Sequence, residues 1–139
     1  MLKINELMAG DLVYRPDCVT TVRELHADGI IGNDSLRGII GYDELEPIAL
    51  TPEVLLRNGY KEFRVDELNG PRNCIGKWWN KDGTVFVKRY VTDPYAYRKT
   101  GETVYTVGSG NHMRIGNVRY VHEFQHALQF CGKEKTVKL

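Results

Sequence analysis

The residues that could most readily carry out a chemical reaction form the run His122-Glu123-Phe124-Gln125-His126. In a helix, residues four apart lie on one face about 6 Å apart, so His122 and His126 could both bind one zinc ion. Glu123 could then act as the general base that activates a zinc-bound water. This spacing predicts the chemistry of a minimal zinc-dependent hydrolase.

The H-E-x-x-H pattern resembles that of the zincin metallopeptidases, but its surroundings offer no obvious third ligand. A catalytic zinc needs three protein ligands and one open position. The extended form of the motif would have Gly at 129 and His at 132, where this chain has Gln129 and Gly132. Cys131 projects roughly 120 to 180° away from the two histidines around the helix axis. We therefore expect no cofactor, with zinc as the alternative if His112 or Glu134 folds back.

The same helix, expected over residues 119–131, also has an uncharged polar face. The face is formed by His122, Gln125, His126 and Gln129. Faces that lack Lys and Glu are more easily buried in an interface. The pattern favours a surface that contacts a protein partner or a second copy of the chain, and the alternative is a simple solvent-exposed face.

A second group of residues could bind single-stranded nucleic acid. Basic and aromatic residues interleave between 77 and 99, where Trp78, Trp79, Lys88 and Tyr90 could stack on bases and neutralise phosphates. Aromatic residues in strands more often pack across the sheet, and the sequence pI of about 7.7 is below that of a strongly basic binder. Nucleic-acid binding is therefore an alternative hypothesis.

Helices and strands must position these candidate residues. The sequence predicts these elements in two groups, one in each half of the chain. Residues 1–50 hold β-prone runs separated by turn signals such as Asp28-Gly29, which predicts a small SH3-like β-barrel. Thr51-Pro52 begins a short connecting helix within residues 51–60. Residues 61–139 predict an antiparallel sheet with one late α-helix. The expected fold class is α+β, and the two halves could pack as one domain.

Charge is distributed unevenly between these halves. Residues 1–60 carry 5 Lys+Arg and 10 Asp+Glu, a net charge of −5, whereas residues 61–139 carry 14 and 8, a net charge of +6. The asymmetry indicates either a basic half that faces a ligand or two lobes that attract one another.

The composition is that of a folded protein outside the membrane. The 139 residues are 42% hydrophobic and 27% charged, and no stretch approaches the roughly 18 to 20 apolar residues of a membrane span. Three cysteines without C-x-x-C spacing argue against a disulfide framework or a zinc knuckle. Because the N-terminal region has no apolar signal segment, we expect a cytoplasmic protein without membrane contact.

Three stretches of the chain resemble a family of short uncharacterised proteins common in prophages and mobile elements of gut anaerobic (Bacteroides-type) bacteria. The stretches are Ile4–Val13, Glu46–Tyr60 and Tyr120–Leu128. The resemblance implies no established activity and no catalytic residues. In that family the late helix keeps positions like His122 and Gln125 without requiring Glu123 or His126, which implies that the zinc-like pattern is a coincidence.

Together these observations predict a non-enzymatic interaction module, encoded on a phage or mobile element, that contacts a protein partner or associates with itself. Two alternatives remain. The first is a zinc hydrolase with His122 and His126 as ligands and Glu123 as the base. The second is a single-stranded nucleic-acid-binding protein.

Overall fold

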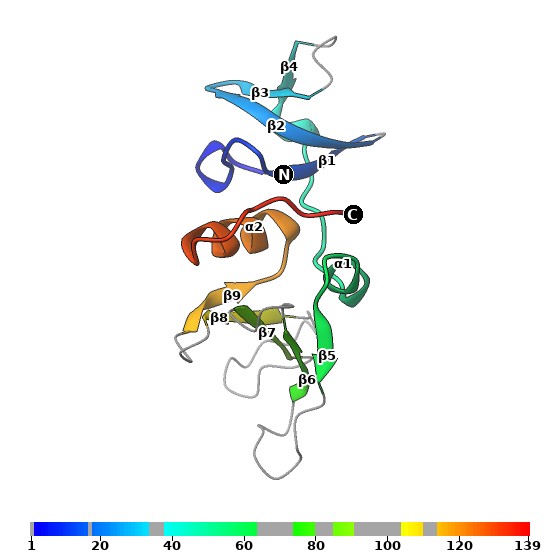
Figure 1. Ribbon diagram of the computed structural model, residues 1–139. Coiled ribbons are helices and arrows are strands. Elements are labelled where there is room, and N and C mark those ends of the chain that lie inside the picture. The colour runs from blue at the N-terminus through cyan, green and yellow to red at the C-terminus, as the bar shows by residue number, and fades with distance from the viewer. Residues whose placement is uncertain are drawn as a thin grey trace, which may run out of the picture.

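The computed structural model describes residues 2–16, 18–33, 38–63, 74–79, 85–90, 104–109 and 114–139. These residues build two antiparallel sheets with a helix between them (Figure 1). The four-stranded sheet lies at one end of the molecule, the five-stranded sheet lies toward the other, and helix α2 occupies the space between. No helix in this part of the chain is long and apolar enough to cross a membrane.

The first sheet is an antiparallel meander in the order β1-β2-β3-β4. Its strands are β1 (Leu12–Arg15), β2 (Cys18–His26), β3 (Gly29–Gly32) and β4 (Ile39–Gly41), and it is flanked by the 3-10 turns η1 (Ile4–Glu6) and η3 (Tyr42–Glu44). The register pairs His26 with Gly29, so a tight turn joins β2 to β3 next to the Asp28-Gly29 signal.

The prediction of an SH3-like barrel is wrong, because this sheet is open. β1 and β4 are its two edges, and the segment that follows β4 contributes one isolated bridge, between Tyr14 and Glu46. Pro47 follows at once and has no N–H with which to extend the ladder. In the part of the chain that is described, sheet dominates and forms no closed barrel, so the α+β character is weak.

The second sheet is also an antiparallel meander, in the order β5-β6-β7-β8-β9. Its strands are β5 (Lys61–Phe63), β6 (Cys74–Trp79), β7 (Val85–Tyr90), β8 (Val104–Ser109) and β9 (Arg114–Val118); helix α1 (Pro52–Arg57) precedes it and helix α2 (Val121–Phe130) follows it. Helix α1 begins as expected, with the Thr51 hydroxyl accepting from the Val54 amide at 3.4 Å. It ends before Gly59, whose positive φ of 87° suits glycine.

Buried apolar side chains form two separate clusters. One lies in the first sheet and includes Leu2, Leu7, Val13, Val22, Ile30, Ile40 and Leu45. The other lies among the second sheet and both helices and includes Leu55, Tyr60, Val85, Val87, Tyr105, Val107, Phe124 and Val137. Neighbouring residues of β1 belong to different clusters, because Val13 is part of the first and Leu12 packs against the second. The two cores therefore meet at β1 and α2.

Candidate functional site

Helix α2 is buried on two sides. Its apolar stripe of Val121, Phe124 and Leu128 belongs to the second core, where the Phe124 ring meets Tyr60 edge-on at 5.7 Å. The 3.6-residue helical period places His122 and Gln125 on another side. These two polar residues are only 3% and 1% exposed. The face that the sequence marked for a partner therefore packs, over most of its length, inside the same chain.

Gln125 joins α2 to two other backbone segments, residues 10–12 and the segment after the helix. Its Oε1 accepts from the Leu12 amide at 2.8 Å, and its Nε2 donates to the carbonyls of Gly10 at 3.1 Å and Lys135 at 2.9 Å. A side-chain amide can both accept and donate, which an aliphatic residue of similar size cannot do. Gln125 thus ties the first sheet, the helix and the segment after the helix together.

Asp11 is the charged centre of this junction. Its carboxylate is fully buried, and Oδ2 lies 2.7 Å from His126 Nε2 and 2.8 Å from the Met8 amide. Oδ1 accepts from Lys135 Nζ at 3.0 Å. Because a carboxylate oxygen only accepts, the close contact assigns the proton of the His126 ring to Nε2. Sequence reasoning missed Asp11 and Lys135, since their partners lie 115 and 124 residues away in the chain.

His122 lies beside this cluster with one ring nitrogen unsatisfied. Its ring stacks on Tyr120 at 5.9 Å and meets the His126 ring edge-on at 5.9 Å. Within the described residues, Nδ1 is buried and has no hydrogen-bond partner. Burial lowers the pKa of His122, although the negative charges of Glu123 and Asp11 oppose this effect. The imidazole is therefore held in its neutral form.

Glu123 is engaged at the beginning of its own helix. One carboxylate oxygen, Oε1, accepts from the Arg119 amide at 2.9 Å and from the Tyr120 amide at 3.1 Å. Backbone amides at a helix start have no partner within the helix, and an acidic side chain three residues after the cap commonly satisfies them. The geometry assigns Glu123 a capping role.

The three hydrolase candidates are thus close in space, but two of them, Glu123 and His126, are bound to other groups. The rings of His122 and His126 are neighbours, yet His126 Nε2 is directed at Asp11 and Glu123 is bound to backbone. Among the described residues no group of three or more His, Cys, Asp or Glu is arranged to hold a metal ion. His112, considered as a third ligand, lies outside these residues.

The exposed end of α2 has a different character. Gln129 is exposed, as expected for the polar face, and Phe130 beside it is 79% exposed. Cys131 packs against the second core, on the side predicted for it, and burial raises the pKa of its thiol. The last turn of the helix therefore presents a large apolar ring next to an uncharged amide.

The nucleic-acid candidates lie on two adjacent strands of the second sheet. Trp78 of β6 pairs with Val87 of β7, and Lys88 pairs with Lys77. Trp79 pairs with Phe86, and Tyr90 pairs with Cys74. The side chains of these four candidates are outside what the structure describes, so only their places in the register are known.

Comparison with known proteins adds no homologue to this description. No protein-family model, curated protein or solved structure shows a significant match to the chain.

Proposed function

We propose that the protein is a non-enzymatic interaction module that contacts another protein through the end of helix α2. The observation that carries the proposal is the exposure of Phe130, at 79%, on a helix that has six of its ten residues buried. Covering a large aromatic ring with a partner protein removes it from water and lowers the free energy. Aromatic residues are accordingly enriched among the few residues that contribute most of the binding energy of an interface. Gln129 beside it supplies hydrogen-bonding groups without a charge that would have to be desolvated.

The contacts of the H-E-x-x-H residues support the non-enzymatic part of the proposal. A general base must be directed at a water, whereas Glu123 is held at the start of its own helix by two backbone amides that donate to Oε1. A zinc ligand must direct a ring nitrogen at the ion, whereas His126 Nε2 contacts Asp11 at 2.7 Å. Glu123 and His126 therefore stabilise the fold that positions the end of α2.

A reducing compartment such as the cytoplasm suits the free thiols of Cys18 and Cys131. We also propose that the protein originates from a phage or mobile element, which the resemblance of Ile4–Val13, Glu46–Tyr60 and Tyr120–Leu128 supports.

Site-specific photo-crosslinking tests the proposed contact. A benzoylphenylalanine placed at position 130 should give one defined adduct in cells, either with a second copy or with one other protein. The matched control is position 56, because Leu56 is also a strongly exposed apolar residue, at 54%, but lies on α1. The substitution Phe130→Asp, made in untagged competitor protein, should remove its ability to compete for the adduct. If positions 130 and 56 give the same diffuse adducts, or none, the proposal fails.

A further inference from the structure

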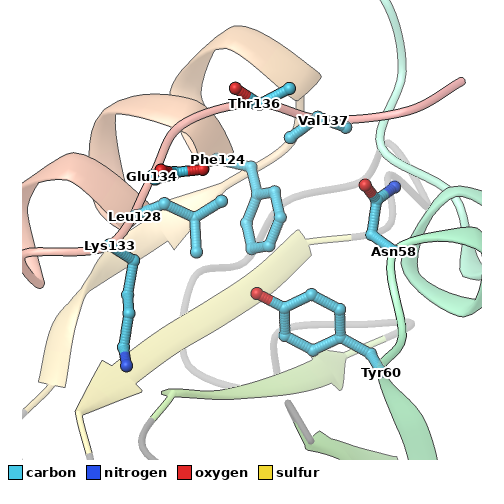
Figure 2. Close-up of a pocket in the computed structure, with 8 residues that line it drawn as sticks. All are labelled: Asn58, Tyr60, Phe124, Leu128, Lys133, Glu134, Thr136 and Val137. Atoms are coloured by element: carbon cyan, nitrogen blue, oxygen red, sulfur yellow. The ribbon is translucent and has the colours of Figure 1, made fainter.

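One face of the five-stranded sheet packs on helix α2. In Figure 2, Phe124 and Leu128 extend from α2 toward the strands of this sheet. The strand residues buried in the same core are Val85, Val87, Tyr105, Val107 and Val118. Successive residues of a strand lie on opposite faces of a sheet, and directly paired residues share a face. The strand residues that alternate with the buried set therefore lie on the opposite face, which we call the outer face.

A row of directly paired residues crosses the outer face. Lys77 of β6 pairs with Lys88 of β7, which pairs with Thr106 of β8. Thr106 pairs with Asn117 of β9, which is exposed and accepts from the Thr106 hydroxyl at 2.8 Å, so the outer face reaches solvent at this end. Like charges directly opposite each other destabilise a sheet, and an anion between them offsets their repulsion. The pair of Lys77 and Lys88 is therefore suited to hold an anion.

The charges of the five strands also favour an anion on this face. The basic residues of the strands are Lys61, Lys77, Lys88, Arg89 and Arg114. The one acidic residue in the strands as described is Glu62. Glu62 pairs with Trp78, and Trp78 pairs with the buried Val87, so Glu62 lies on the core face. The described positions of the outer face therefore include basic residues and no acidic residue.

Aromatic residues flank the lysine pair on the outer face. Phe86 and Tyr90 lie two residues before and after Lys88 in the same strand. Phe86 pairs directly with Trp79 of β6. Three of the four nucleic-acid candidates, all except Trp78, therefore share this face with Phe86.

We propose that the outer face binds single-stranded nucleic acid, in addition to the protein contact at the end of α2. Lys77 and Lys88 bind phosphates, and the three aromatic residues Trp79, Phe86 and Tyr90 stack on bases. Every nucleotide has a phosphate and every base has an aromatic face, so binding of this kind has little sequence preference. A duplex offers phosphates as well, but its bases are already paired and stacked on one another, so it binds more weakly.

Fluorescence anisotropy of labelled oligonucleotides tests the proposal on the full chain. Thymidylate and uridylate strands of about 12 nucleotides probe DNA and RNA, because sites of this kind cover about 4 to 16 nucleotides. We expect saturable binding of at least one strand, with an affinity that falls between about 50 and 200 mM salt. A thymidylate–adenylate duplex of the same length should bind more weakly than the single strand.

Three variants that each remove one positive charge identify the surface. Lys77→Gln and Lys88→Gln should each reduce the slope of log affinity against log salt by about 0.7, the value for one phosphate contact on a single strand. Lys138→Gln is the matched control, because Lys138 is exposed but lies in the segment after α2. This control should leave the slope unchanged.

Two aromatic variants test base stacking. Trp79→Leu and Phe86→Leu keep an apolar residue in the strand and should each weaken binding of the single strand about tenfold. Circular dichroism shows whether each variant is folded, and if an aromatic variant is not, the salt slopes of the lysine variants decide. The proposal is overturned if the wild type shows no saturable binding, if the duplex binds as tightly as the single strand, or if Lys77→Gln and Lys88→Gln keep the wild-type slope.

Discussion

Replacing Gln125 by Leu tests whether the buried amide holds the two sheets together. Leu has nearly the same volume, so the change removes hydrogen bonding with little change in packing. Three backbone groups lose their partner: the Leu12 amide and the carbonyls of Gly10 and Lys135. All three groups lie in partly buried contacts at the junction between the two cores.

The expected cost follows from these three contacts. Each buried polar group left without a partner lowers the free energy of unfolding by about 1 to 3 kcal/mol. Burial of the Leu side chain raises it by about 1.5 to 3 kcal/mol. Taking about 2 kcal/mol for each of the three groups and about 2 to 3 kcal/mol for the burial of Leu, we expect Gln125→Leu to lower the free energy of unfolding by about 3 to 4 kcal/mol. For a chain of this size, such a loss corresponds to a decrease in Tm of roughly 10 °C.

Urea unfolding followed by circular dichroism measures this difference, and Gln129→Leu is the matched control. Gln129 lies one turn further along the same helix and is exposed, so its substitution should change the free energy of unfolding by less than about 0.5 kcal/mol. The reasoning is refuted if Gln125→Leu is as stable as the control. A lower m-value in the variant would indicate that the two sheets no longer unfold together.

Three further predictions concern single contacts of the same region. Glu123→Ala removes the acceptor for two backbone amides and should cost about 1 kcal/mol of stability in urea unfolding, whereas Glu123→Gln keeps an acceptor oxygen and should cost less than half as much; equal costs would contradict the capping role. The folded-state pKa of His122 is below its unfolded value, so the unfolded chain binds more protons, and wild-type stability should fall as the pH decreases below about 6.5. His122→Phe should weaken this dependence, measured between about pH 5.5 and 7.5, and parallel curves for the two proteins would count against a buried neutral imidazole. Asn58→Ala should accelerate hydrogen exchange of the Lys138 amide while exchange within α2 stays unchanged, and unaltered protection of Lys138 would show that the segment after α2 does not depend on Asn58.

The helix α2 and its apolar stripe could be predicted because helical periodicity is a local property. The polar face opposite the stripe was equally visible in the sequence. What covers this face was not, because its partners are the backbone of residues 10–12 and the side chain of Asp11, more than 110 residues away. A local pattern can show that a face is suited to burial, but it cannot distinguish a second protein from a remote part of the same chain.

The limits of the barrel prediction have a similar origin. Turn signals such as Asp28-Gly29 depend on a few adjacent residues, and the predicted hairpin is present. Closure depends on whether the last segment pairs along the whole first strand, and here the pairing is a single bridge between Tyr14 and Glu46.

For Glu123 a local signal did exist, since a glutamate three residues after a helix cap is typical of capping. The H-E-x-x-H pattern offered Glu123 only as a possible general base, and its capping role was not predicted.

The burial of Asp11 among residues from the other end of the numbering has a consequence for how the protein folds. During synthesis from the N-terminus, the strands of the first sheet emerge long before His126, which donates to this carboxylate, and Lys135, which neutralises it. Until then Asp11 must stay hydrated, so the first sheet cannot complete its packing on its own. Contacts of such long sequence separation slow folding and prolong the exposure of open strand edges. The same junction that makes the finished molecule rigid therefore leaves its first half dependent on residues that are made more than a hundred positions later.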